Sequence, residues 1–147
     1  MSKSTEELFN ELTDARAVED YLQQNRKDLQ VPDLGLYLRT LLLEKNCKRA
    51  DIIRKANLEI SYGYRLFEGS KVHPGRDKVL ALAIGFQLNL AETNHLLQYA
   101  GLRELYPRDR RDSIVQFGLQ NNYNLDTINQ ILHSYQCHEL DLVKDND

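Results

Sequence analysis

The sequence predicts an all-α fold, and two patterns indicate it. Nearly every segment places apolar residues at the 3.6-residue spacing of an amphipathic helix. No segment shows the sustained apolar-polar alternation, rich in β-branched residues, that a half-buried strand requires. The chain has 147 residues, which is long enough for one compact domain with a substantial core. We therefore expect one helical domain with a helical appendage.

Two short helices are expected before residue 33. Ser4 stands three residues before Glu7, which is the spacing of a capping box. The apolar residues of the helix that it opens are Leu8, Phe9 and Leu12. The apolar residues of a second helix are Val18, Tyr21 and Leu22. Residues 31–33, Val-Pro-Asp, then break the chain.

Longer helices are expected on either side of residues 48–67. Asp33 can cap a helix that runs from Leu34 to about Asn46. Its inner face consists of Leu34, Leu38, Leu41 and Leu42. From Arg76 onward, the segment RDKVLALAIGFQL is apolar almost all round, so we expect a central buried helix there.

Between these two helices lies a pair of shorter helices joined by a tight turn. Residues 48–56 give the first, whose apolar face consists of Ile52, Ile53 and Ala56. Asn57 tolerates the left-handed conformation that a sharp turn needs. Residues 61–67 give the second helix, and Gly69 can supply the positive φ of its C-cap.

Charge is distributed unevenly along the chain. The formal net charge is −3, but residues 45–78 hold 9 basic and 4 acidic side chains, which is a local charge of +5. Residues 1–32 carry 4 basic and 7 acidic side chains, and residues 106–147 carry the same numbers. A local basic patch on an acidic chain can still bind phosphate, because screening over about 10 Å makes the nearest charges count most.

The chain also contains an internal repeat, in which residues 76–97 match residues 111–132 at an offset of 35. The identical pairs are Arg76/Arg111, Asp77/Asp112, Asn89/Asn124, Leu90/Leu125, Asn94/Asn129 and Leu97/Leu132. Each copy is expected to form a helical hairpin whose second helix is capped by Asn89 or Asn124. With two copies and no third, we interpret the repeat as a doubled hairpin that extends the core. A chance likeness between amphipathic helices is the alternative, which the shared polar positions disfavour.

Several kinds of site are not indicated. A zinc site needs four ligands, and His133, Cys137 and His138 have no matching partners nearby. Cys47 and Cys137 are expected to be reduced thiols. No glycine-rich phosphate loop follows a strand, and Ser61 has no His and Asp around it for nucleophilic catalysis. We therefore expect no metal, no cofactor and no enzymatic activity.

The chain also lacks the usual membrane signals. No apolar run approaches the roughly 18 residues needed to cross a bilayer. The N-terminus does not have the basic-then-apolar pattern of a secretory signal. We expect a cytoplasmic protein without a membrane partner. Residues 108–112, RDRRD, could form a second phosphate site, but their alternating signs favour an internal ion-pair cluster.

Residues from Leu34 to about Leu97 resemble the Xre, or lambda-repressor-like, helix-turn-helix family of bacterial transcriptional regulators. The match lies in KRADIIRKANL at residues 48–58, in LFEG at residues 66–69, and in Pro74. The segments SYGY at 61–64, GRDK at 75–78 and YPRDRRD at 106–112 further resemble a subgroup that keeps a C-terminal hairpin. The resemblance implies five short helices, of which the third enters the DNA major groove.

The resemblance implies a domain organisation and a set of DNA contacts. We expect an N-terminal helical segment at 1–32, the helix-turn-helix domain at 33–105, a C-terminal hairpin on the same core at 106–140 and a disordered tail at 141–147. By position, Lys48 and Arg49 are implied to contact phosphate. The groove-facing residues are Ser61, Tyr62 and Arg65, with Tyr64 at the edge. The expected backbone contacts after the helix are Lys71, His73 and Arg76.

The sequence departs from the family pattern at two positions. Ile60 stands where relatives often present a polar, base-reading residue. Gly63 replaces an apolar anchor, and Gly inside a helix costs about 1 kcal/mol relative to Ala, which predicts a less rigid recognition helix. Tyr62 and Tyr64 can alternatively be packing residues, since tyrosine has an apolar body with a polar tip.

Two functions are therefore open. The first is a sequence-specific regulator that binds double-stranded DNA as a homodimer on paired half-sites. The second is a protein-protein interaction module that keeps the fold without binding DNA, with Ile60, Tyr62 and Tyr64 as its docking patch. The acidic N-terminal helices and the C-terminal hairpin are candidates for dimerisation or for binding a protein partner.

Overall fold

The computed structural model describes residues 3–15, 17–25 and 33–140. The described residues form nine helices and no strand, so the all-α prediction is confirmed. The helices are α1 (Thr5–Asp14), α2 (Val18–Gln24), α3 (Leu34–Lys45), α4 (Arg49–Lys55), α5 (Ile60–Glu68), α6 (Arg76–Phe86), α7 (Leu90–Tyr99), α8 (Arg110–Gln120) and α9 (Leu125–Ser134). None of them is long and apolar enough to span a bilayer.

The chain divides into two compact units, Met1–Pro32 and Asp33–Asp147. The first contains α1 and α2, and neither helix buries a residue. Ser4 caps α1 as expected, because its Oγ accepts a hydrogen bond from the amide of Glu7 at 3.1 Å. The expected break at Val31-Pro32 and the expected tail at 141–147 lie outside the described residues.

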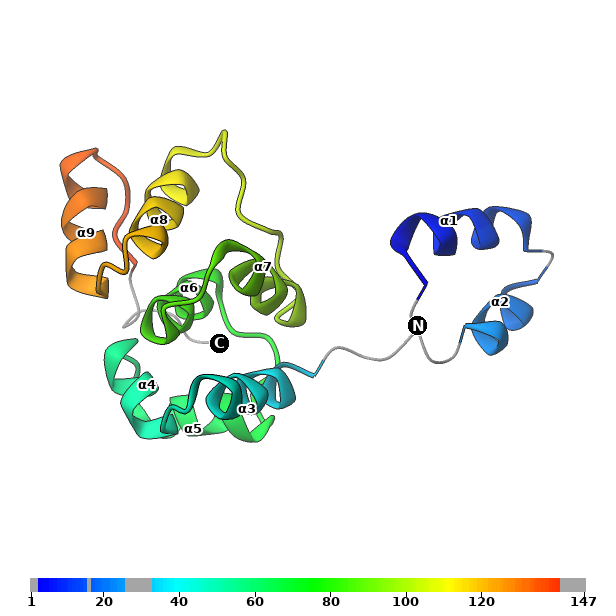
Figure 1. The fold of residues 1–147 in the computed structure, drawn as a ribbon, viewed down its shortest axis with the longest axis horizontal. Coiled ribbons are helices and arrows are strands. Elements are labelled where there is room, and N and C mark those ends of the chain that lie inside the picture. The colour runs from blue at the N-terminus through cyan, green and yellow to red at the C-terminus, as the bar shows by residue number, and fades with distance from the viewer. Residues whose placement is uncertain (1–2, 16, 26–32, 141–147) are drawn as a thin grey trace. The chain divides into compact units, whose positions relative to one another are not determined.

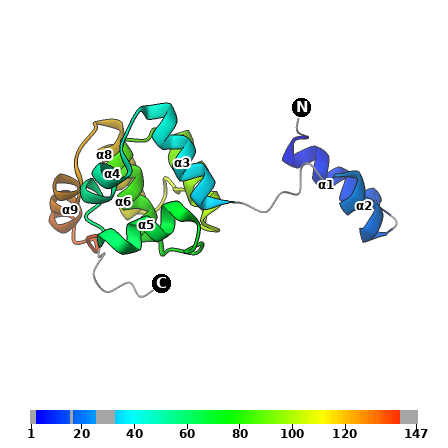
Figure 2. The same ribbon diagram turned by 90° about the horizontal axis from the view of Figure 1, so that it is seen from below.

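The second unit is built around α6, which is buried from Lys78 to Phe86. It packs against α4 and α7 and also against α8 and α9 (Figure 1). Figure 2 views the molecule from the side of α3–α5 and shows α4 next to α6. The expectation of a central buried helix is confirmed, and its cause is the continuous apolar sequence of this segment.

Helix α3 begins at the expected cap, where the Asp33 carboxylate accepts a hydrogen bond from the amide of Leu36 at 3.0 Å. Its core-facing residues are Leu34, Leu38 and Leu41. Leu42, also expected on this face, is half-buried and packs against the core. Asn46 ends the helix in the left-handed conformation, with φ 52°.

The pair α4 and α5 has the predicted turn. Asn57 is left-handed, with φ 56°, and Gly69 ends α5 with φ 91°. The apolar face of α4 is buried as expected, because Ile52, Ile53 and Ala56 all lie in the core. These local signals fix both helices before any long-range packing is considered.

Gly63 is explained by the packing of α4 against α5. A Cβ at this position would lie 2.7 Å from side-chain carbons of Ile53, which is closer than real Cβ contacts. Glycine therefore lets α4 and α5 pack closely together. The Ile53 side chain fills the space that an apolar side chain at position 63 would occupy. The same arrangement recurs in the C-terminal hairpin, where a Cβ on Gly118 would lie 2.4 Å from Ile128.

The internal repeat is a structural repeat, so the prediction of two helical hairpins is confirmed. Asn89 Oδ1 accepts a hydrogen bond from the amide of Glu92 at 2.8 Å, and Asn124 Oδ1 accepts one from Thr127 at 2.9 Å. A second pair of equivalent bonds joins Asn94 Oδ1 to the amide of Leu105 and Asn129 Oδ1 to the amide of Leu140, at 2.9 and 2.8 Å. The repeat therefore extends to residue 140.

Reciprocal ion pairs join the two hairpins. Arg76 pairs with Asp112 at 2.9 Å, and Arg111 pairs with Asp77 at 2.8 Å. Each arginine also donates to two carbonyls at the end of its own copy, at residues 103 and 104 for Arg76 and at 138 and 139 for Arg111. Because each pair maps onto the other when the copies are exchanged, the hairpins are related by an approximate two-fold axis.

The expected ion-pair cluster at residues 108–112 is confirmed for Asp109, Arg111 and Asp112. Arg108 and Arg110 are exposed and take no part in these ion pairs. The network also corrects the expectation for Arg76, which was placed at the DNA backbone. The guanidinium is instead bound to Asp112 and to backbone carbonyls. The 35-residue spacing of Arg76-Asp77 and Arg111-Asp112 was the available sequence signal for this pairing.

We predict that Gly63→Ala destabilises the protein by about 1–3 kcal/mol, because the added methyl group would overpack Ile53. Thermal unfolding followed by circular dichroism measures this effect. Glu68→Ala, at an exposed position of the same helix, is the control and should leave the midpoint nearly unchanged. In the double variant Gly63→Ala/Ile53→Ala, the two losses should be less than additive. A higher midpoint for Gly63→Ala would show that helix propensity, not packing, governs this position.

Candidate nucleic-acid interface

The nine basic residues between 45 and 78 do not form one surface. Lys45 pairs with Glu92 at 3.1 Å, and Arg76 pairs with Asp112. Lys78 is buried, with its ammonium 3.8 Å from the centre of the Tyr62 ring. These three cations are bound within the second unit, so the basic surface is smaller than the local charge of +5 suggests.

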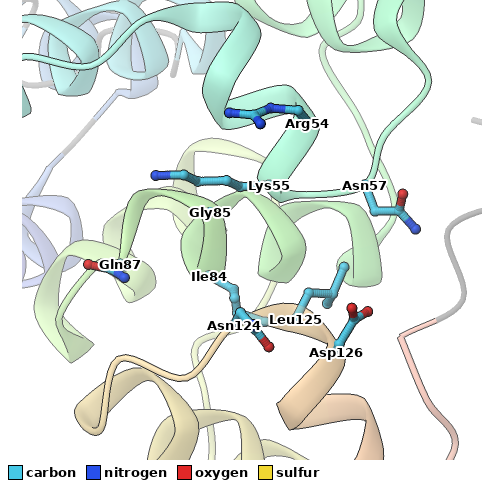
Figure 3. Close-up of a pocket in the computed structure, with 9 residues that line it drawn as sticks. All are labelled: Arg54, Lys55, Asn57, Ile84, Gly85, Gln87, Asn124, Leu125 and Asp126. Carbon is cyan, nitrogen blue, oxygen red and sulfur yellow. The ribbon is translucent and has the colours of Figure 1, made fainter.

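Two further cations, Arg54 and Lys55, line a pocket of about 490 Å³. Their side chains extend from α4 in the same direction, over the end of α6 (Figure 3). The remaining lining residues are Asn57, Ile84, Gly85, Gln87, Asn124, Leu125 and Asp126. Because Asp126 adds a negative charge and Arg54 also lies 3.3 Å from Asp51, the pocket is not uniformly basic.

The other four cations surround the start of α4 and the exposed side of α5. Lys48 precedes α4, Arg49 is its first residue, Arg65 lies in α5 and Lys71 follows α5. Lys48, Arg49 and Arg65 are exposed, and Lys71 is half-buried. We call these four residues the cation cluster. All four were predicted as DNA contacts.

Two tyrosines support the cation cluster. The Arg49 guanidinium lies 4.4 Å from the centre of the Tyr64 ring. Arg65 and Lys71 lie 5.7 and 5.8 Å from the centre of the Tyr62 ring. Stacking a cation against an aromatic ring restrains it while its outer N–H groups still reach other ligands. Tyr64 therefore restrains Arg49, whereas Arg65 and Lys71 lie farther from the Tyr62 ring.

This arrangement corrects the prediction that Tyr62 faces the groove. Its side chain is only 7% exposed and packs in the core. The cause is the apolar face of α5, which consists of Tyr62, Gly63, Leu66 and Phe67. Tyr64 is half-buried beneath Arg49, so the packing alternative applies to both tyrosines.

Ser61 is exposed, but its hydroxyl is bound within the chain. It donates to the carboxylate of Glu59, at 2.7 and 2.8 Å to the two oxygens. The same carboxylate caps α5 by accepting from the amides of Ser61 and Tyr62. The hydrogen bond from the Ser61 hydroxyl, followed by those from the backbone amides and the charge of Arg65, lowers the pKa of Glu59.

Glu59 is therefore a functional residue that the sequence did not reveal as a cap. Glutamate is not among the preferred N-cap residues, and the spacing from Glu59 to Ser61 gives no recognised signal. Its carboxylate lies at the end of α5 where the helix amides would otherwise attract an anion. The Glu59 carboxylate therefore opposes phosphate binding at the N-terminus of α5. The positive charge that attracts phosphate comes instead from the cation cluster.

His73 is exposed and lies beside the turn that follows α7, since a Cβ on Gly101 would be 3.9 Å from His73 Nδ1. Within the described part of the chain, no group of three or more His, Cys, Asp and Glu side chains could hold a metal ion. Cys47 and Cys137 are free, half-buried thiols.

The candidate interface thus consists of the cation cluster, the exposed residues Ile60 and Ser61, and the two supporting tyrosines. Comparison of the chain with models of known protein families, with curated proteins and with solved structures gives no match. What this surface can bind follows from its own charge and geometry.

We predict that Glu59→Gln lowers the thermal midpoint at neutral pH, because the variant loses a charged cap. The pKa of Glu59 is lowered on folding, so its stabilisation is fully present above the ordinary value of 4.5 and is lost as the pH falls through the folded-state pKa. The difference in midpoint between the wild type and the variant should therefore shrink as the pH falls below 4.5.

Glu68→Gln is the matched control for this prediction, because it removes the same charge at the other end of α5. A negative charge near a helix C-terminus is unfavourable, so this variant should not lower the midpoint. Equal midpoints for Glu59→Gln and the wild type at pH 7 would contradict the capping role.

Proposed function

We propose that the chain is a DNA-binding regulator of the Xre, or lambda-repressor-like, helix-turn-helix type, with α5 as the helix that enters the major groove. The observation that carries this proposal is the cation cluster around the start of α4 and the exposed side of α5. The five consecutive helices α3 to α7 agree in number with the domain that the sequence resemblance implies.

Each cation has a separate task in this proposal. Lys48 and Arg49 precede and begin α4, where they would bind phosphates on one side of the groove, and Lys71 would bind the backbone beyond α5. Arg65 projects from the exposed side of α5, and its planar guanidinium can donate two hydrogen bonds to a guanine edge. Tyr64 acts indirectly, since its ring restrains the Arg49 guanidinium.

The structure weakens the alternative of a protein-docking patch on α5. That patch required Ile60, Tyr62 and Tyr64 to be exposed together. Tyr62 is buried, and the ring of Tyr64 is covered by Arg49, so Ile60 is the one large apolar residue that α5 exposes. A surface with one exposed apolar side chain beside several cations suits a polyanion better than an apolar partner.

We predict that the protein binds mixed-sequence duplex DNA at low salt and releases it steeply as salt rises. The three phosphate contacts of Lys48, Arg49 and Lys71 would reduce the affinity about fortyfold between about 50 and about 200 mM salt. Fluorescence anisotropy with a labelled duplex measures both quantities. The absence of any association near about 50 mM salt would sink the proposal.

Single substitutions separate the two kinds of contact. Arg49→Ala should weaken binding to all sequences about equally and reduce the salt slope by about 1, as expected for a phosphate contact. Arg65→Ala should relax sequence preference at one position, measured by selection from a random duplex library. Arg108→Ala removes an exposed arginine outside α4 and α5 and is the matched control, which should change neither quantity. Equal effects of Arg65→Ala on every sequence would remove Arg65 from the base-reading role.

A further inference from the structure

The pocket between α4, the end of α6 and the start of α9 is separate from the candidate nucleic-acid interface, since no residue of the cation cluster lines it. Its volume of about 490 Å³ lies within the range of about 300–1,000 Å³ that small-molecule sites occupy. Helix α4 bounds the pocket on one side and α9 on the other, and both helices pack on α6. A molecule bound there would therefore contact both the α4–α5 pair and the second hairpin.

The pocket has a basic end and an acidic end. Arg54 and Lys55 extend from α4 toward the side on which Gln87 lies, whereas Asp126 and Asn57 lie on the opposite side (Figure 3). Asp126 is in the first turn of α9, where its carboxylate offsets the partial positive charge of the helix N-terminus. One end of the pocket therefore attracts an anion, and the other end attracts a cation.

The charges at the two ends are available to a bound molecule. Within the described residues, Lys55 and Asp126 form no ion pair, either with each other or with another side chain. In the same residues, Arg54 pairs with Asp51 alone, at 3.3 Å, and its side chain is 72% exposed. A guanidinium has five N–H donors, so this contact leaves most of them for a ligand.

Neutral groups line the space between the two ends. The side chains of Ile84 and Leu125 are almost fully buried, and together with Gly85 they form the apolar part of the wall (Figure 3). The exposed side chains of Asn57 and Gln87 make no hydrogen bond to another described residue. An apolar wall with a few polar groups at defined positions is the usual composition of a small-molecule site.

We propose that this pocket binds a small zwitterion whose anionic and ammonium groups lie at opposite ends of the molecule. The anionic group, a carboxylate or a phosphate, binds Arg54 and Lys55, and the ammonium group binds Asp126. Because these two ends of the pocket lie apart, a molecule with separated charges fits it better than an α-amino acid, which carries both groups on one carbon. The pocket shares no residue with the proposed DNA contacts, so the proposal stands without DNA binding.

Nuclear magnetic resonance on the isotope-labelled full chain tests the proposal, with ω-amino acids of increasing length as probes. The probes are β-alanine, γ-aminobutyrate and ε-aminocaproate, each added to about 10 mM because small ligands bind weakly. At least one of them should shift the amide resonances of residues 54–57, 84–87 and 124–126. For the tightest probe, the matched acid without the amine and the matched amine without the carboxylate should each bind about threefold more weakly, or weaker still.

Single substitutions test each end of the pocket. Asp126→Asn should weaken the zwitterion about threefold but should not weaken the matched acid, which has no ammonium group. Lys55→Gln should weaken the zwitterion and the matched acid alike. Both side chains are exposed, so circular dichroism should show unchanged helix content. Glu68→Gln and Arg108→Gln remove exposed charges outside the pocket and are the matched controls, which should change no affinity.

Phosphoethanolamine distinguishes the two kinds of anionic group. Tighter binding than that of γ-aminobutyrate supports the proposal with a phosphate as the anionic group, and the reverse order supports it with a carboxylate. The absence of any shift at the pocket with every probe would overturn the proposal. Equal binding of the zwitterion and its two matched analogues would also overturn it, as would binding that neither Asp126→Asn nor Lys55→Gln weakens.

Discussion

The burial of α6 on all sides is the constraint on which the second unit depends. A helix that is apolar around its whole circumference must be covered by other helices on every face. Helices α4 and α7 and the second hairpin, α8–α9, supply that cover. Gly85 shows how closely α4 approaches, since a Cβ there would lie 3.1 Å from the carbonyl oxygen of Ile52. Packing against α6 therefore fixes the position of the α4–α5 pair, which carries the cation cluster.

Charge is divided between two tasks in this unit. One set of ions holds the hairpins together, with Asp112 almost fully buried and accepting hydrogen bonds from Arg76, Arg103 and the amide of Tyr106. A buried carboxylate is tolerated only with such complete pairing, and removing one partner is strongly destabilising. The other set, the cation cluster, is left at the surface. This division explains how an acidic chain can present a basic face.

The duplication of the hairpin has unequal consequences for its two copies. The first copy became the centre of the core, whereas the second copy covers part of α6 and exposes the aromatic side chains of Phe117 and Tyr135. Both copies keep the asparagine cap of their second helix, the second asparagine bond and the arginine contacts. Local hydrogen bonding was thus conserved between the copies while their environments diverged.

The sequence alone determined the helices, because their boundaries depend on local signals such as the Asp33 cap, the left-handed Asn57 and the C-cap at Gly69. It also determined the repeat and the local excess of basic residues. Only the tertiary structure decided which basic residues are exposed, because that depends on contacts between segments far apart in the chain. Arg76 was expected to contact DNA but binds Asp112, which is 36 residues away in the chain. Tyr62 was expected to face the groove but is buried in the core, because packing, not residue type, selects the buried face of a short helix. The reason for glycine at position 63 likewise became clear only from the tertiary structure, in which the Ile53 side chain packs against it.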